Sequence, residues 1–214
     1  MKTALAKQIY DDLESKILGN SYTSDDIFTE VKIAQLYKVS RTPAREALEL
    51  LLANDLLLHD DESEHLIARN FSNKDYIDIF DLRIKMEGMI ARLCTQNATE
   101  KICESLTENI ILQSFYLEKQ NFERICELDN QFHGIICENC NNWILQKINR
   151  DFHRYTKSIK KKSFRYEGRP KESVAEHKRI CDAICSGNAD LAEELASFHV
   201  VQVKRNLLEH GYCK

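Results

Sequence analysis

A carboxylate and an imidazole lie one helical turn apart in the stretch ELDNQFHGIICENCNNWIL, residues 127–145. They are Asp129 and His133, and both sit beside the apolar stripe of an amphipathic helical pattern. Two further histidines, His177 and His199, fall on the apolar faces of later helical patterns. Side chains of these types at this spacing could coordinate one metal ion.

A single imidazole on an apolar face is most often a core residue that hydrogen-bonds to a neighbour, and this alternative stays open for His177 or His199 alone. Burying one carboxylate and three imidazoles without partners, however, costs several kcal/mol. A divalent ion satisfies all four groups and favours their deprotonated forms. Three nitrogens and one oxygen suit Zn²⁺, which we expect first, and also Ni²⁺, Co²⁺, Mn²⁺ or Fe²⁺. Such a site requires three converging helices.

Other chemical signals are less specific. Cys137 and Cys140 have zinc-knuckle spacing, but no second pair follows, so we expect both to be structural. His153 and His210 have no evident partners in the sequence. Most of the eight cysteines occupy apolar positions of helical patterns, where a free thiol behaves as a small hydrophobic group, and a reducing compartment fits them.

The composition is that of a globular, mainly helical protein. The 214 residues are 43% hydrophobic and carry a formal net charge of −4. Only two prolines and six glycines are present, and alternating β-branched runs are nearly absent, so we expect a mainly α fold. No run reaches the roughly 20 apolar residues that a membrane-spanning helix needs, and the acidic N-terminus is unlike a signal peptide. We therefore expect a cytoplasmic location and no membrane partner.

The helical patterns fall into two groups, which predict domains at 1–70 and 71–214. The first group has three short helices and then a hairpin at 56–69, where two apolar runs flank an acidic turn. The apolar faces of these helices carry Ile9, Leu13 and Ile17, then Ile33, Leu36 and Tyr37, then Ala44, Leu48, Leu51 and Leu52. The second group is all-helical, with breaks near 97–99, 120–121, 140–141, 168–170 and 187–188.

The segment YKVSRTPAREALELL, between the second and third helices, predicts a sharp turn into a capped helix. Ser40 is placed to cap this helix, and Pro43 falls in its first turn, whose amides need no intrahelical partner. The side chains at the helix start suit phosphate oxygens and, for arginine, the O6/N7 edge of guanine; they are Ser40, Arg41, Thr42 and Arg45. This is the arrangement of a helix-turn-helix recognition helix, and a plain structural turn is the alternative.

The charge of residues 1–70 opposes nonspecific attraction to DNA. The segment holds 8 Lys and Arg residues against 13 Asp and Glu residues, a net charge of −5. Binding then has to use a local basic patch, with steep salt dependence. The residues of this patch are Lys32, Lys38, Arg41 and Arg45.

The segment IFTEVKIAQLYKVSRTPAREALELLLANDLLL resembles the winged helix-turn-helix of the GntR family of bacterial transcription regulators. VSRTPAREAL, residues 39–48, is the most specific part of this resemblance. It implies that Arg41, Thr42 and Arg45 contact double-stranded operator DNA and that the hairpin is a wing entering the minor groove. At the wing tip, residues 60–64 read DDESE, and these acids would repel phosphate.

Residues 72–210 resemble the FCD domain, the all-helical effector domain found in one branch of GntR regulators. The resemblance rests on a D-x3-H pair, a later EH pair and a third histidine, which are matched here by Asp129, His133, Glu176-His177 and His199. It implies a metal at the floor of a cavity within the helical bundle, and a small carboxylate effector that reaches this ion.

Three arginines are candidates for holding the carboxylate of the effector. Arg83 matches the R-x3-E segment of the family and would face the cavity; the alternative is a surface arginine paired with Glu87 one turn away. Arg150 and Arg154 follow the ligand helix and are further candidates. Asn142 follows the same helix, and we expect it to cap the next one.

Together these patterns predict a ligand-responsive DNA-binding transcription regulator that is not an enzyme. Two copies of the N-terminal module would grip a palindromic operator, and the C-terminal domain would form the homodimer, because paired half-sites require paired recognition helices. One alternative keeps DNA binding but makes the metal structural, or makes the metal itself the signal. Another is a metallohydrolase, for which the sequence offers no evident general base beside the four ligands.

Overall fold

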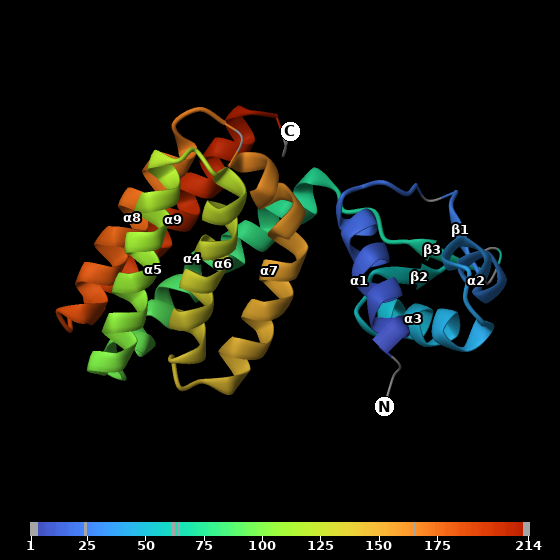
Figure 1. Ribbon diagram of the computed structural model, residues 1–214, viewed down its shortest axis with the longest axis horizontal. Helices are drawn as coiled ribbons and strands as arrows, with labels where there is room; N and C mark the ends of the chain where they lie inside the picture. Colours follow the sequence, from blue (N-terminus) through green and yellow to red (C-terminus); the bar gives the residue numbers. More distant parts are fainter. Residues whose placement is uncertain (1–3, 24, 61–62, 64, 165, 212–214) are drawn as a thin grey trace. The chain divides into compact units, whose positions relative to one another are not determined.

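The structure is a computed structural model, shown in Figure 1, and it describes residues 4–23, 25–60, 63, 65–164 and 166–211, with the backbone alone for 157–162. The chain forms two compact units, Met1–Ser72 and Asn73–Lys214. The boundary predicted after residue 70 lies two residues before this division. Three of the acidic residues at the predicted wing tip, Asp61, Glu62 and Glu64, lie outside the described residues.

The N-terminal unit packs three helices beside a small antiparallel sheet. The helices are α1 (Ala4–Leu18), α2 (Glu30–Tyr37) and α3 (Arg41–Ala53), and the strands are β1 (Ile27–Phe28), β2 (Leu57–His59) and β3 (Leu66–Ala68). The sheet order is β1-β3-β2, with Ile67 opposite both Ile27 and Leu58. Strands β2 and β3 confirm the predicted hairpin. Strand β1 is absent from the prediction because two residues cannot show an alternating pattern.

Apolar side chains at helical spacing hold the N-terminal unit together. Those that are at most 2% exposed include Ile9, Leu13, Ile17, Ile33 and Leu51. Burying one such side chain stabilises the fold by on the order of 1.5–3 kcal/mol. Leu36 is 57% exposed, so its predicted place on an apolar face is wrong. The short helix α2 buries only Ile33 and Ala34.

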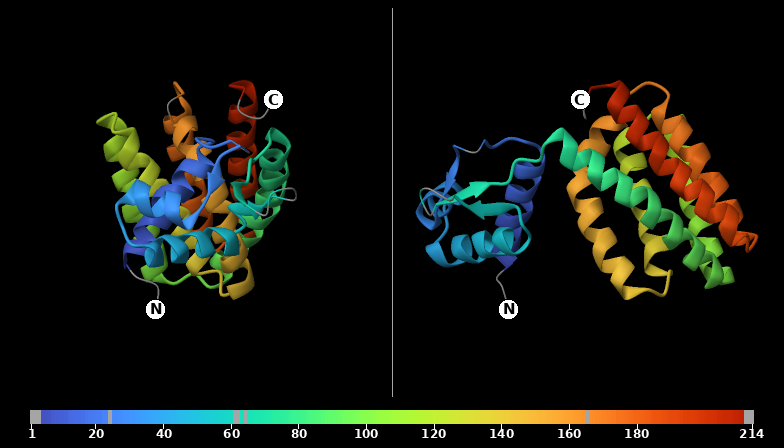
Figure 2. Two further views of the ribbon diagram at one scale, coloured as in Figure 1. Left: turned by 90° about the vertical axis from the view of Figure 1, so that its right-hand side faces the viewer. Right: turned by 180° about the vertical axis from the view of Figure 1, so that it is seen from behind.

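The C-terminal unit is a helical bundle, and the mainly α fold class is confirmed. Its helices are α4 (Asn73–Gln96), α5 (Glu100–Glu118), α6 (Phe122–Glu138), α7 (Trp143–Ser163), α8 (Arg169–Cys185) and α9 (Ala189–Glu209). Helix α4, in green, runs along α9, in red, and Figure 2 shows this pair from behind. Gly88 permits the close approach, because a Cβ there would clash with Ser197 Oγ on α9.

Polar caps start several of these helices at the predicted breaks. Thr99 Oγ1 accepts a hydrogen bond from the N–H of Ile102 at the start of α5. Asn142 Oδ1 accepts one from the N–H of Leu145 at 3.1 Å, which confirms that Asn142 caps α7. None of the described helices is both long enough and apolar enough to span a membrane.

Candidate metal centre

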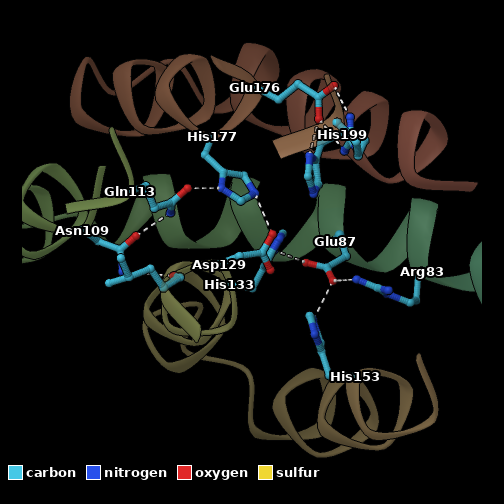
Figure 3. A network of polar contacts seen from close by, with 12 residues as sticks. Arg83, Glu87, Asn109, Gln113, Asp129, His133, His153, Glu176, His177 and His199 are labelled. Carbon is cyan, nitrogen blue, oxygen red and sulfur yellow. Dashed lines mark hydrogen bonds and ion pairs between the residues drawn. The ribbon is translucent and has the colours of Figure 1, made fainter. Parts of the chain in front are cut away.

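Three helices bring the four predicted ligands together in the core of the bundle. Asp129 and His133 lie one turn apart on α6, His177 comes from α8 and His199 from α9. One ligand atom from each residue lies within 4.8 Å of one from every other, and all four residues are at most 5% exposed. Figure 3 shows the four side chains converging from three helices. The convergence that the sequence predicts is therefore present.

The imidazole of His177 is oriented by an amide from another helix. Its Nδ1 lies 3.0 Å from Oε1 of Gln113 on α5. Since an amide oxygen only accepts hydrogen bonds, Nδ1 must carry a proton, and in the neutral imidazole Nε2 then has the lone pair. This Nε2 lies 3.6 Å from Asp129 Oδ1. Gln113 is itself fixed, because its Nε2 donates to Asn109 Oδ1 at 2.6 Å.

The imidazole of His199 is oriented by a carboxylate. Its Nδ1 lies 2.6 Å from Glu176 Oε2. Glu176 in turn accepts two hydrogen bonds from the guanidinium of Arg169, at 2.9 and 3.0 Å, and both residues are buried. Because Nδ1 contacts Glu176, Nε2 would be the nitrogen of His199 that binds an ion. Glu176, from the EH pair, is thus a supporting residue.

The two ring nitrogens of His133 have different surroundings. Its Nδ1 lies 3.3 Å from Glu87 Oε2 on α4. Its Nε2 is buried and has no hydrogen-bond partner among the described residues. A buried polar nitrogen in this state costs about 1–3 kcal/mol unless something binds it. The residues present therefore fit a metal ion at the centre of the cluster.

Glu87 is the hub of a second group that adjoins the ligands. Its Oε1 lies 2.8 Å from His153 Nε2 on α7 and accepts a hydrogen bond from Arg83 at 3.0 Å. Burial raises the pKa of Glu87, but the facing His133 and His153 outweigh it and hold this pKa well below its ordinary value. Burial, together with the charge of Arg83, lowers the pKa of His153. Arg83 already places a positive charge beside Glu87. The group around Glu87 therefore suits a role in supporting the ion of the four-residue cluster better than it suits binding a second ion.

The expectation that His153 has no partner is wrong, because Glu87 binds it across 66 residues of sequence. One feature of the sequence, a polar stripe on α7, could have indicated that His153 has a buried partner. Asn149, His153 and Thr156 lie on one stripe of α7, and Asn149 and Thr156 are at most 2% exposed. A polar stripe that faces inward indicates a buried network.

The three predicted effector arginines have different surroundings. Arg83 is 2% exposed, so it is not the surface arginine of the alternative, although it does pair with Glu87. It also donates to Thr156 Oγ1 at 3.0 Å. Arg150 is exposed on α7. Arg154 forms an ion pair with Asp151 of its own helix at 3.3 Å. Of the three, Arg83 is the one whose described contacts join the network of Figure 3.

Two family models match the chain and together cover most of it. The model described as "FCD domain" matches residues 78–202, and the model described as "Bacterial regulatory proteins, gntR family" matches residues 5–63. The chain belongs to the FCD branch of the GntR family. It is a DNA-binding transcriptional regulator of this type, as the sequence resemblance predicts.

Relatives of this GntR regulator match it along nearly the whole chain. It is 24% identical over 209 residues to the uncharacterized HTH-type transcriptional regulator YdhC of Bacillus subtilis, covering 95% of this chain and 92% of that protein. It is 21% identical over 201 residues to the HTH-type transcriptional repressor RspR of Escherichia coli, covering 94% and 88%. The solved structure of E. coli McbR/YncC gives a TM-score of 0.75 at 18% identity, covering 97% and 99%. This last likeness shows a shared fold.

The predicted DNA-contacting side chains lie around the start of α3 in the GntR module. Ser40 is the N-cap residue in an extended conformation, but its side chain makes no capping hydrogen bond in the described structure. Arg41, Thr42 and Arg45 are exposed, as is Lys32 on α2. Arg41 donates two hydrogen bonds to Glu30 Oε2, at 3.0 and 3.3 Å. Arg45 also has an acidic partner, because its Nε lies 3.8 Å from Oε1 of Glu49, one turn later on α3.

The Cys137-x2-Cys140 pair lies in the apolar core. Cys137 is 7% exposed and Cys140 is 1% exposed, and both belong to the main core cluster of the bundle. Cys140 Sγ donates to the carbonyl oxygen of Asn142 at 3.7 Å. Burial raises the pKa of Cys137 to about 11, so this thiol stays protonated at neutral pH.

Proposed function

We propose that this GntR regulator binds one divalent metal ion through Asp129, His133, His177 and His199, and that a small organic acid binding at the ion changes its affinity for the operator. One observation carries the proposal. Each of the three imidazoles has its Nδ1 within 3.3 Å of a fixed oxygen, on Glu87, Gln113 or Glu176. Histidines that bind metals are oriented in this way by their second nitrogen.

We expect zinc first, and the donor set suits nickel, cobalt, manganese or iron as well. Three imidazole nitrogens and one carboxylate oxygen are borderline ligands that all these ions accept. An ion held by these four residues would supply Lewis acidity, and with five or six ligands in total it would accept a ligand from solution. The buried charges of the chain then decide which ligand fits.

The balance of buried charge favours a small monocarboxylate as the effector. The Arg83–Glu87 and Arg169–Glu176 pairs each cancel. Against two positive charges on an ion, Asp129 supplies one negative charge, which leaves one positive charge to be neutralised. Uncompensated charge is costly in a buried site, and a monoanion removes it, whereas a tricarboxylate would reverse it.

The DNA-binding half of the proposal uses the exposed start of α3. Arg41, Thr42 and Arg45 would contact base edges and phosphates, with Ser40 and Lys32 on neighbouring phosphates. Arg41 would have to exchange its contact with Glu30 for one with DNA. Two copies of the chain, joined as a homodimer through the C-terminal unit, would read a palindromic operator. Repression, the activity named for one relative, is the regulatory sense we favour.

Helix α4 is the proposed route between the effector and the DNA-binding half. It begins at Asn73, where the C-terminal unit begins, and it carries both Arg83 and Glu87. A carboxylate that bound Arg83 would compete with Glu87 for its guanidinium and would alter the support of His133. Coupling of this kind is typically worth about 1–3 kcal/mol.

Two alternatives remain open to test. In the first, the ion is structural or is itself the signal, and no organic effector exists. In the second, the ion activates water in a metallohydrolase, with Glu87 as a candidate base. Glu87 is already engaged by Arg83, His133 and His153, and relatives named as regulators favour the first alternative over the second.

Operator binding with and without candidate acids tests the proposal. An operator is first selected from a random duplex library, and its Kd is then measured by fluorescence anisotropy on the zinc-loaded protein. We expect at least one small monocarboxylate to change this Kd by roughly 5–150-fold. Asp129→Ala should keep operator binding and lose the response. If no acid changes the Kd of the wild type, the organic effector is rejected. A drop in melting temperature for Asp129→Ala, without any acid response in the wild type, would identify a structural ion.

A further inference from the structure

Helix α4 carries a row of apolar side chains that the single chain leaves partly open to solvent. We call this row the α4 stripe; its members are Ile79, Leu82, Met86, Met89 and Leu93. Leu82 is 55% exposed and Met89 is 47% exposed, and the other three are half-buried. Single exposed apolar side chains are ordinary on a protein surface, but a continuous row of them indicates contact with another molecule.

The spacing within the α4 stripe is that of one helix packing against another. Successive members are three, four, three and four residues apart, a pattern that repeats every seven residues. This pattern keeps the side chains in one line along the helix, where they can pack between the side chains of a facing helix. Packing within one chain uses Leu93, which adjoins the core cluster, but leaves about half of Leu82 and of Met89 exposed.

The charges along one edge of the α4 stripe fit a second copy of the same chain. Asp78 borders the first half of the stripe, and Lys85 and Arg92, at intervals of seven residues, border the second half. When a two-fold axis crosses the helix, two stripes run antiparallel, and the acidic half of each meets the basic half of the other. Asp78 and Arg92 have partners at the surface of their own chain, Lys74 and Glu193, and such contacts exchange at little cost.

The face around the α4 stripe has about the area that a stable dimer needs. Helix α4 lies between α9 and α7 on this side of the bundle, as Figure 2 shows from behind. Val201 on α9 adds to the apolar area, because it is 40% exposed and lies one turn after Ser197, which bonds to α4. A helix of 24 residues is about 36 Å long, and with the near sides of its neighbours the face is about 20 Å wide, or about 700 Å². Standard interfaces bury about 800 Å² on each partner.

Another exposed apolar face, on α5, fits a second copy less well. Ile111 is 61% exposed and Phe115 is 49% exposed. Glu104, Glu108 and Glu118 share this face, because each is three or seven residues away from one of these two side chains on the helix. Two copies meeting there would gather these carboxylates in one contact, and like charges oppose association.

We propose that the α4 stripe is the surface through which two copies of this regulator form the homodimer, with the two α4 helices antiparallel across a two-fold axis. The inference rests on the homodimer of the proposed function and names the contact that holds it. Leu82 and Met89 supply the apolar centre of this contact. Leu82 directly precedes Arg83, and Met86 directly precedes Glu87. An effector that moved Arg83 or Glu87 would therefore alter the dimer contact through the same helix.

Sedimentation equilibrium of the zinc-loaded, full-length protein tests the proposal. We expect the wild type to sediment at twice the mass of one chain. Leu82→Lys should raise the dissociation constant of the dimer by on the order of 30-fold or more, because a charge at the centre of an interface costs at least as much as truncating a strong contact. Helix content and zinc affinity should stay at their wild-type values, because Leu82 is exposed in the single chain. Met89→Lys should act in the same way and decides the matter if Leu82→Lys loses helix content.

Ile111→Lys is the matched control, because it changes an exposed apolar side chain of α5 to the same cation. It should leave the dimer intact. Wild-type dissociation constants in both Leu82→Lys and Met89→Lys would overturn the α4 contact and leave the homodimer standing. Dissociation of Ile111→Lys, with a dimeric Leu82→Lys, would move the contact to α5 and overturn the proposal. A wild type that sediments as a monomer would overturn this inference and the homodimer together, whereas the zinc titration judges the metal centre by itself.

Discussion

Replacing Gln113 by methionine tests the link between the orientation of an imidazole and metal binding. Gln113 is fully buried and touches no ion itself, but its Oε1 fixes the proton of His177 on Nδ1. Methionine has a similar volume and offers only a weak acceptor. In Gln113→Met, the ring of His177 can therefore change tautomer or rotate, and Nε2 is no longer held ready for the ion.

The expected loss of zinc affinity follows from the strength of such supporting contacts. Removing a residue that hydrogen-bonds to a metal-binding histidine typically weakens metal binding by about 10–100-fold. This corresponds to roughly 1.4–2.7 kcal/mol. The variant also leaves Asn109 Oδ1 without the donor that lies 2.6 Å away in the wild type. The free energy of unfolding of the metal-free protein should therefore fall by about 1–3 kcal/mol as well.

The assay is competition for zinc against a chromophoric chelator, with denaturant unfolding in parallel. Thr95→Val is the matched control, because it removes another buried hydrogen bond, from Thr95 Oγ1 to the carbonyl oxygen of Ala91 at 2.8 Å, away from the cluster. It should lower stability and leave zinc affinity unchanged. Zinc affinity in Gln113→Met equal to that of the wild type would refute the reasoning about His177.

Three further predictions concern the DNA-binding helix, pH and metal removal. Arg41→Ala should weaken operator binding by on the order of 1–3 kcal/mol, measured by anisotropy, and an unchanged Kd would remove Arg41 from the interface. Hydrogen bonds from Lys16 and then Tyr37 lower the pKa of Asp12 from its ordinary value of 3.8. The stability that Asp12 contributes is thus present above that value and is lost as pH falls through the lower, folded-state pKa, so Asp12→Asn should flatten the pH dependence of unfolding below about pH 5. An equally steep profile in the variant would contradict this. Chelating an ion present at about 100 times its Kd should lower the free energy of unfolding by roughly 2.7 kcal/mol, and a melting temperature that ignores the chelator would count against a bound ion.

The sequence predicts the residues that share one face of one helix. Asp129 and His133 are recognisable because i,i+4 spacing is local, and the inward places of His177 and His199 follow from periodicity. The hairpin and the helix breaks are visible for the same reason, since turn and cap residues act over a few positions. The resemblance to known regulators supplies the remaining step, from three helices to one shared site.

The supporting network lies beyond such local reasoning. Gln113 and His177 are 64 residues apart, and Glu87 and His153 are 66 residues apart. The whole bundle's packing decides which helices are neighbours and how far they are shifted along their axes. A single sequence therefore does not indicate these pairs. Gln113 in particular reads as an ordinary polar residue of a helix until His177 is placed against it.

The claim that four side chains hold one ion is tested most directly by anomalous diffraction from crystals of the zinc-loaded protein. We predict one peak per chain in the C-terminal unit, bonded to Asp129 and to the Nε2 atoms of His133, His177 and His199. Zinc–nitrogen distances of about 2.0–2.1 Å are expected. A peak among Glu87, His133 and His153 instead, or none within the bundle, would contradict the assignment of these four residues.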